Sequence, residues 1–204
     1  MKAVITGDII NSRRGLISKA LEDLKKVLTL YGETPREWEI YRGDSFQLRL
    51  DNPEVSLRAA MRIKASMKTE KARDVRLAIG IGAISYLAQR VTESNGDAFI
   101  RSGEKFEQLR KQKLNLAVKS QWPEWDEEMN LFIRLALIAM DDWTTASAEY
   151  MSVQLAHDNL NQEEIAPRLG IGQSSVSERK ARAHYDALQQ LERRFRKTLR
   201  SRIQ

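Results

Sequence analysis

The sequence contains no cysteine among its 204 residues. This absence excludes a disulfide framework, a thiolate metal site and a cysteine nucleophile, and it fits a protein of the reducing cytosol. Long apolar runs are also missing, because the longest uninterrupted run of apolar side chains, residues 135–140, is bounded by Arg134 and Asp141. Such a stretch is far too short to cross a membrane, and the first residues lack the apolar core of a secretory signal. We therefore expect a soluble, cytoplasmic protein with no membrane partner.

The composition is that of an ordinary globular protein, with 42% hydrophobic and 30% charged residues. These fractions exclude wholesale disorder, and the length favours a core domain with a smaller appended module. The pattern of the sequence changes near Trp122, beyond which no strand-like run occurs. We therefore expect two domains, residues 1–121 and residues 122–204.

The positive charge is concentrated at the C-terminal end of the chain. The formal net charge is +6, and residues 159–204 hold ten basic and five acidic side chains, which give this segment a net charge of +5. A concentrated basic segment attracts a polyphosphate partner such as a nucleic acid. The alternative is a solvated charged tail with no partner.

Strand-like and helix-like patterns alternate in the first 121 residues. Two alternating runs flank Gly43, Asp44 and Ser45, which predicts a β-hairpin, and apolar residues at spacings of three and four predict amphipathic helices. This order predicts an α+β fold built on a ferredoxin-like split βαβ unit, whose antiparallel sheet is covered by helices on one face. The predicted strands are residues 2–6, 38–42, 46–50, 75–81 and 114–118, and the predicted helices are residues 15–31, 53–67 and 98–111.

The second domain is predicted to be all-α and to contain a helix-turn-helix at residues 161–180. Asn161 can cap its first helix, and Glu164, three residues later, can complete a capping box. Gly170 suits the left-handed conformation that ends a helix. Pro167 departs from the pattern, because a proline beyond the first turn removes a backbone hydrogen bond.

The second helix of this motif carries short polar and basic side chains of the kind that contact phosphates and base edges in a major groove. We expect double-stranded DNA as a partner, and a homodimer, because a palindromic site needs two modules. Glu178 on the same face either weakens this interpretation or reads a cytosine. The alternative is an αα-hairpin of a helical bundle with no role in DNA binding. The predicted DNA-binding residues are Gln173, Ser174, Ser175, Ser177, Arg179, Lys180 and Arg182.

Two aspartates of the first domain are candidate metal ligands. Asp8 directly follows the first predicted strand, and Asp44 lies in the hairpin turn. In a split βαβ sheet the first strand lies beside the hairpin, so the two carboxylates can converge. Oxygen ligands without histidine or cysteine favour Mg²⁺, completed by water and by phosphates of a ligand. The alternative is that the two aspartates only stabilise turns, as aspartate commonly does, and bind no metal.

Several motifs in order resemble those of the SatD-like family of small bacterial proteins. They are Val4–Arg13, Tyr41–Gln47, Arg76–Gly82 and Ser94–Gly103, together with Asp142-Trp-Thr144 and the helix-turn-helix, so the resemblance spans nearly the whole chain. More distantly, the N-terminal half resembles class III nucleotidyl cyclases and the GGDEF palm, in which two such aspartates bind divalent metals over a triphosphate.

The resemblance to cyclases implies a set of site residues. Asp8, the carbonyl group of Ile9 and Asp44 fall on the metal positions. The implied nucleotide or phosphate contacts are Asn11, Ser12, Arg13, Arg42, Gly43, Arg76 and Arg101. The sequence departs from cyclases on the following helix, which carries Arg101 but no asparagine, since Asn95 lies in the preceding loop. The resemblance therefore implies nucleotide or metal binding rather than cyclisation.

Two functional hypotheses follow, and neither assigns a catalytic residue. The first is a DNA-binding transcriptional regulator whose cyclase-like domain senses a nucleotide or a metal, with Mg²⁺ as the expected cofactor. The alternative is a Mg²⁺-dependent nucleotide-processing enzyme of the cyclase or palm type with an accessory helix-turn-helix. A third hypothesis is an interaction scaffold whose acidic residues are structural.

Overall fold

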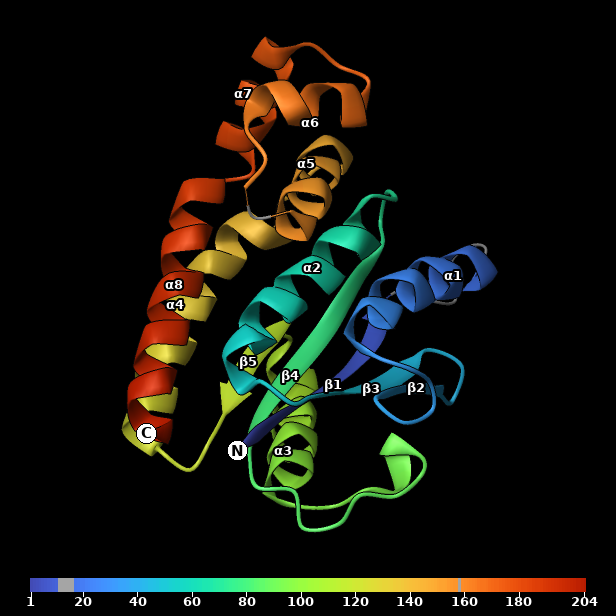
Figure 1. Ribbon diagram of the computed structural model, residues 1–204, viewed down its shortest axis with the longest axis vertical. Coiled ribbons are helices and arrows are strands. Elements are labelled where there is room, and N and C mark those ends of the chain that lie inside the picture. The colour runs from blue at the N-terminus through green and yellow to red at the C-terminus, as the bar shows by residue number, and fades with distance from the viewer. Residues whose placement is uncertain (11–16, 158) are drawn as a thin grey trace.

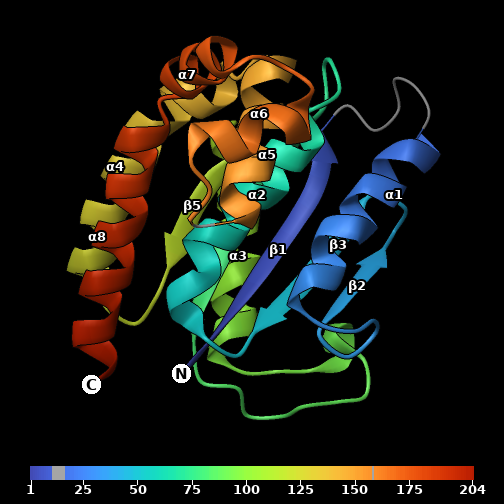
Figure 2. The same ribbon diagram turned by 45° about the horizontal axis from the view of Figure 1, so that its top comes forward.

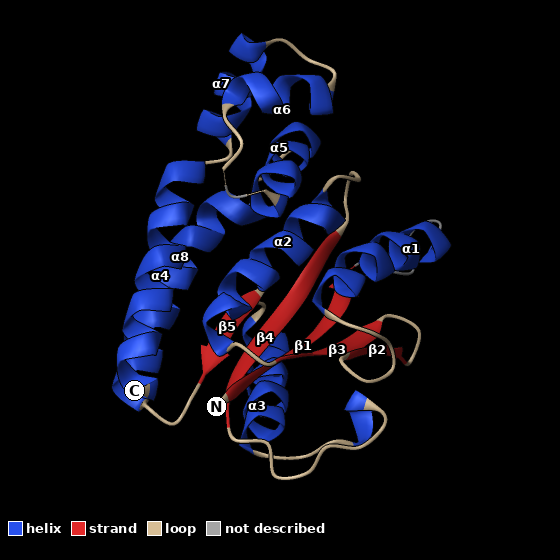
Figure 3. Cartoon of the chain, viewed as in Figure 1, coloured by secondary structure: helices blue, strands red, loops and turns tan. Residues whose placement is uncertain are grey.

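A computed structural model describes residues 1–10, 17–157 and 159–204 of the chain. The fold is α+β, as predicted, and its sheet has five strands in the order β2-β3-β1-β4-β5 (Figures 1 and 3). The strands are β1 (Lys2–Ile10), β2 (Trp38–Tyr41), β3 (Ser45–Leu50), β4 (Asp74–Gly82) and β5 (Leu116–Lys119). The central strand, β1, is antiparallel to both β3 and β4, which confirms that the first strand lies beside the hairpin.

The sheet is mixed and carries helices on both faces, so the prediction of an antiparallel sheet covered on one face was wrong. β5 runs parallel to β4. α1 (Ile17–Leu28) and α2 (Ser56–Lys68) cover the face to which Ile5 and Ile79 point, whereas α3 (Asp97–Gln112) covers the opposite face with Val4 and Ala98 (Figure 2). Small residues of β4 explain the difference, because a Cβ atom at Gly80 would lie 2.1 Å from the carbonyl oxygen of Ala98. The absence of a side chain at that position lets α3 lie directly against the strand.

The first strand is longer than the sequence predicted, and this changes the place of Asp8. β1 extends to Ile10, so Asp8 lies within the strand rather than after it, opposite Ser45 of β3 and Arg76 of β4. Gly7 interrupts the apolar pattern of the sequence, but a Cβ atom there would lie 2.7 Å from the Phe46 ring. The glycine therefore allows close packing inside the strand and does not end it.

The remaining elements are helical. They are α4 (Pro123–Asp141), α5 (Thr145–Ala156), α6 (Gln162–Leu169), α7 (Gln173–Arg182) and α8 (Tyr185–Ile203), with short 3₁₀ turns at Thr29–Tyr31, Pro53–Val55 and Val91–Glu93. α4 packs against β5 and α8, and α5 packs against α2. Trp125 joins α4 to α8 through Phe195, with ring centroids 5.2 Å apart. One apolar core therefore continues from the sheet into the helices. No helix among the described residues combines the length and apolar character that a membrane crossing requires.

Candidate functional site

The local geometry of α6 and α7 agrees with the sequence predictions for residues 161–182. The Asn161 side chain accepts hydrogen bonds from the backbone of Glu163 and Glu164, and the Glu164 carboxylate accepts one from the Asn161 N–H at 2.8 Å, which confirms the capping box. Gly170 ends α6 in the left-handed conformation, with φ of 64°. Ile165 and Val176 are fully buried between the helices. α6 and α7 are thus fixed relative to each other by caps, a glycine turn and a small apolar contact.

A third helix supports this pair. α5 packs against both α6 and α7, and the Arg179 guanidinium of α7 lies 2.6 Å from the Glu149 carboxylate of α5. Figure 1 shows α6 and α7 next to α5 at one end of the molecule, away from the sheet. The outer surface of α7 is therefore accessible in a single protomer.

The predicted DNA-binding residues divide into two groups by exposure. Ser175, Arg179 and Lys180 are half-buried, whereas the others are exposed. Each basic residue already has an acidic partner: Arg179 pairs with Glu149, Lys180 lies 2.8 Å from Asp186, and Arg182 lies 2.5 Å from Glu178. Phosphates would have to compete with these carboxylates. The exposed members are Gln173, Ser174, Ser177 and Arg182.

Asp8 and Asp44 are brought together at the end of the β-hairpin. The Ile9 N–H donates to the Asp44 carbonyl oxygen at 3.1 Å, and the Asp44 charge is close enough to affect Asp8. Burial raises the pKa of Asp8, the guanidinium of Arg76 opposes this, and Asp44 raises the pKa further. Asp8 Oδ2 lies 3.3 Å from Arg76 Nη1, whereas its buried Oδ1 has no hydrogen-bond partner among the described residues. Asp8 is therefore a poorly solvated carboxylate, and within that part of the chain no donor compensates the burial of its Oδ1.

Three neighbours of Asp8 were missed by the sequence reasoning. Glu107 and Arg110 of α3 act on its pKa in opposite directions, Glu107 raising it and Arg110 lowering it. Burial raises the pKa of the Tyr41 hydroxyl, Arg42 lowers it, and Asp8 raises it. No local signal identifies Glu107 and Arg110, because their proximity to Asp8 depends on α3 crossing the second face of the sheet, and Tyr41 lies on the edge strand β2.

The remaining predicted nucleotide contacts are placed differently. Arg42 and Gly43 occupy the exposed hairpin turn, both with left-handed φ values, of 52° and 89°. Arg101 donates to the Ile81 carbonyl oxygen at 2.8 Å and to Asp97 at 3.1 Å. Ile81 lies five residues along β4 from Arg76, roughly 16 Å away at the rise of an extended strand, so Arg101 is not near Asp8. Asn11, Ser12 and Arg13 lie outside the described residues.

The acidic site offers two carboxylates that a Mg²⁺ ion could use as ligands. Asp8 and Asp44 supply carboxylate oxygens, and the unpaired Asp8 Oδ1 suits a hard cation. Within the described ranges, however, no group of three or more histidine or acidic residues is arranged to hold a metal. Arg76 also offsets part of the negative charge. The residues fit a cation only if water and the oxygens of a ligand complete its coordination.

No protein-family model, curated protein or solved structure matches this chain.

Proposed function

We propose that this chain is a DNA-binding transcriptional regulator of the SatD-like type, in which α6 and α7 form the helix-turn-helix. One observation carries the proposal. α7 is held against α5 and α6 by caps and buried apolar residues, yet it presents Gln173, Ser174 and Ser177 to solvent on a segment with a net charge of +5. A rigid helix with exposed short donors is what major-groove recognition requires.

The roles of the side chains follow from their exposure. We propose that Gln173, Ser174 and Ser177, with amide and hydroxyl groups near the start of α7, contact base edges. Arg182, near the end of the helix, is proposed to bind a phosphate. Arg179 is held by Glu149 and is expected to orient α7 on α5, and to reach the DNA backbone only by leaving that carboxylate.

The sheet domain is proposed to sense a ligand. The strand order β2-β3-β1-β4 is the one expected of a split βαβ unit, to which β5 adds an edge strand. Asp8 and Asp44, with the Ile9 carbonyl group, would hold Mg²⁺ together with a nucleotide phosphate. The alternative, a nucleotide-processing enzyme, has less support, because Arg101 is engaged with Ile81 and Asp97, away from the acids.

A homodimer is part of the proposal, because α4 has an apolar outer face. Leu131, Leu135 and Ile138 are 48%, 58% and 70% exposed, and they recur at helical spacing along one side of α4. Beside them lies a mainly apolar groove of about 570 Å³ between α4 and α8. A ridge next to a groove is self-complementary, so a second copy related by a two-fold axis can cover both.

The DNA-binding proposal is tested with fragments of the genome around the gene for this chain. The double variant Arg179→Ala/Arg182→Ala should weaken binding at least about tenfold, because it removes the charge-assisted phosphate contact of Arg182, which contributes roughly 1.5–3 kcal/mol, and the Arg179 side chain that orients α7 on α5. Wild-type affinity should also fall steeply with salt. The matched control, Lys25→Ala/Arg36→Ala, removes two exposed basic residues from the sheet domain and should bind as wild type. Equal losses in the two variants, or no wild-type binding at low salt, would contradict the proposal.

The enzymatic alternative has its own test. Each nucleoside triphosphate is incubated with the protein and Mg²⁺ or Mn²⁺, both without and with bound DNA. A product that forms with wild type and not with Asp44→Asn would favour the enzyme. The absence of any product favours the regulator.

A further inference from the structure

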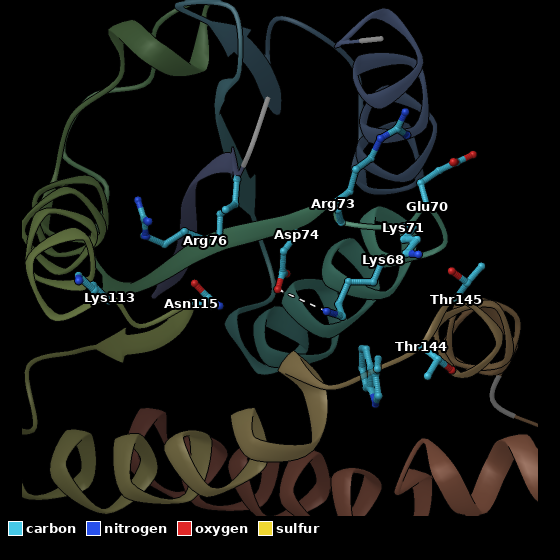
Figure 4. Close-up of a pocket in the computed structure, with 13 residues that line it drawn as sticks. Lys68, Glu70, Lys71, Arg73, Asp74, Arg76, Lys113, Asn115, Thr144 and Thr145 are labelled. Atoms are coloured by element: carbon cyan, nitrogen blue, oxygen red, sulfur yellow. Dashed lines mark ion pairs between the residues drawn. The ribbon is translucent and has the colours of Figure 1, made fainter. Parts of the chain in front are cut away.

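A basic pocket of about 430 Å³ lies beside the acidic site, where β1 ends and β4 begins. Its wall combines the end of α2, the start of β4, the end of α3 and the start of α5, as Figure 4 shows. The basic residues of this wall are Lys68, Lys71, Arg73, Arg76 and Lys113. Its acidic residues are Glu70 and Asp74, so the lining carries an excess of positive charge.

The two acidic residues are already matched by cations. Asp74 accepts a hydrogen bond at 2.7 Å from Lys64, which is fully buried and does not line the pocket. Glu70 pairs with Lys19 of α1, which lies outside the lining as well. Three of the basic residues of the lining also have carboxylate partners, because Lys68 lies 3.6 Å from Asp74, Arg73 lies 3.4 Å from Asp23 and Arg76 pairs with Asp8. The positive charge that remains in excess is therefore that of the other two, Lys71 and Lys113.

Lys71 and Lys113 are the cations most available to a ligand. Both are exposed and line the pocket, and neither forms an ion pair with any residue that the structure describes. Arg76 also lines the pocket while holding Asp8 at 3.3 Å, so the pocket adjoins the acidic site. Figure 4 shows Lys71 and Lys113 at opposite sides of the lining, so an anion with several charges is needed to contact both.

The start of α5 adds a second source of positive potential. Thr144 and Thr145 line the pocket, and Thr144 caps α5 by accepting from the Ser147 N–H at 3.2 Å. The first turn of α5 contains no acidic residue. The first N–H groups of a helix lack intrahelical acceptors, and the helix dipole makes this end positive. An anion in the pocket can therefore meet both ammonium groups and backbone N–H groups.

We propose that this pocket binds a phosphate-bearing small molecule, with Lys71, Lys113 and the N-terminus of α5 as the phosphate-binding groups. A volume of about 430 Å³ lies within the range of pockets for small-molecule ligands. Strong positive charge over a lining formed by several segments selects an anion with several charges, such as a di- or triphosphate.

The pocket is connected to α7 through Trp143. This residue lines the pocket, and its indole N–H donates at 3.0 Å to the carbonyl oxygen of Ala183, the C-cap of α7. The ion pair between Glu149 and Arg179 provides a second link, from α5 to α7. A phosphate that draws the start of α5 inward would therefore shift α7. This step rests on the proposed DNA-binding function.

Binding is measured by calorimetric titration with inorganic tripolyphosphate and, separately, with each nucleoside triphosphate. Wild type should bind tripolyphosphate saturably, and Lys71→Ala/Lys113→Ala should weaken binding at least about tenfold, since two charge-assisted contacts are lost. The control Lys25→Ala/Lys111→Ala removes two exposed lysines outside the pocket and should leave the affinity unchanged. Equal weakening in both double variants, or no saturable binding by wild type, would overturn the proposal. Tighter binding of one nucleoside triphosphate than of tripolyphosphate would identify the ligand as a nucleotide.

Coupling is measured as the change in DNA affinity when tripolyphosphate is added. Glu149→Gln, on α5 and outside the pocket lining, loses the ion pair with Arg179, so it should bind tripolyphosphate as wild type while the change in DNA affinity becomes smaller. A change in DNA affinity as large as that of wild type in Glu149→Gln would overturn the coupling, and one that persists in Lys71→Ala/Lys113→Ala would indicate simple competition between polyanions. The two proposals can fail separately. Anion binding without DNA binding would contradict only the proposed DNA-binding function, and DNA binding without anion binding would contradict only the proposed anion site.

Discussion

Glu178 is exposed on α7, and replacing it with glutamine is expected to strengthen DNA binding. Its carboxylate lies 2.5 Å from Arg182, with the two side chains 59% and 68% exposed. It therefore competes with a phosphate for Arg182 and adds a negative charge to the proposed DNA-binding surface. Removal of this acidic residue is thus predicted to increase, rather than decrease, the affinity for DNA.

The magnitude follows from two small electrostatic terms. An exposed ion pair between residues four apart on a helix contributes about 0.4 kcal/mol. Wild type loses this energy when Arg182 leaves Glu178 for a phosphate, whereas Glu178→Gln has no such pair to break. A carboxylate about 8 Å from a phosphate in water costs about 0.5 kcal/mol. The sum, about 1 kcal/mol, corresponds to about fivefold tighter binding. The thermal midpoint should change by only about 1 °C, because the pair itself contributes so little.

The assay is a fluorescence anisotropy titration of a labelled duplex at several salt concentrations. Glu178→Gln should bind more tightly than wild type and show a steeper salt dependence, by about one unit of slope, since one more phosphate is effectively neutralised. Glu22→Gln, which removes an exposed carboxylate from α1, should bind as wild type. An unchanged or weaker affinity of Glu178→Gln for all duplexes would refute this reasoning. A loss of affinity that occurs only with duplexes carrying a cytosine at one particular position would show that Glu178 contacts that base.

Three further predictions concern the sheet domain and the dimer. Asp8→Asn should raise the free energy of unfolding above that of wild type near neutral pH. The difference between the two proteins should vanish as the pH falls toward the ordinary carboxyl pKa of 3.8, because burial raises the pKa of Asp8 and penalises only its ionised form. Denaturant titrations at several pH values measure this difference, and a difference that does not change with pH would contradict the prediction. Gly80→Ala should lower the free energy of unfolding by about 3 kcal/mol or more, whereas Gly103→Ala, whose Cβ atom would meet nothing within 4 Å, should raise it by about 0.5–1 kcal/mol. Calorimetry giving equal changes would contradict the proposed packing of α3. Leu135→Glu should weaken a dimer at least about tenfold in sedimentation equilibrium, and Leu30→Glu, on a different exposed surface, should not; a monomeric wild type would contradict the dimer.

The features predicted well from the sequence are those governed by neighbouring residues. The capping box of Asn161 and Glu164 and the left-handed Gly170 depend on interactions within a few residues, so the sequence pattern contains the whole physical cause. The same holds for most strand and helix positions. The meeting of Asp8 and Asp44 was also predictable, because a split βαβ order places the first strand beside the hairpin.

The features that were missed depend on contacts between distant segments. The extent of β1 was underestimated because Gly7 and Asp8 look unlike a strand, whereas the backbone pairing of β3 and β4 on either side maintains it. The second helical face depends on how Ala98 approaches Gly80, which no local pattern encodes. The basic pocket combines side chains from several elements across more than one hundred residues, so no spacing within the sequence could indicate it.

The most direct test of the central claim uses the absence of native cysteine. Ser177→Cys on α7 and Ser18→Cys on α1 each provide a unique thiol, to which an iron chelate that cleaves nearby DNA is attached. With a genomic fragment bound, the conjugate at position 177 should cut the duplex at a discrete position, and the conjugate at position 18 should not. Cleavage from position 18 alone, or equal and scattered cleavage from both positions, would contradict DNA recognition by α7.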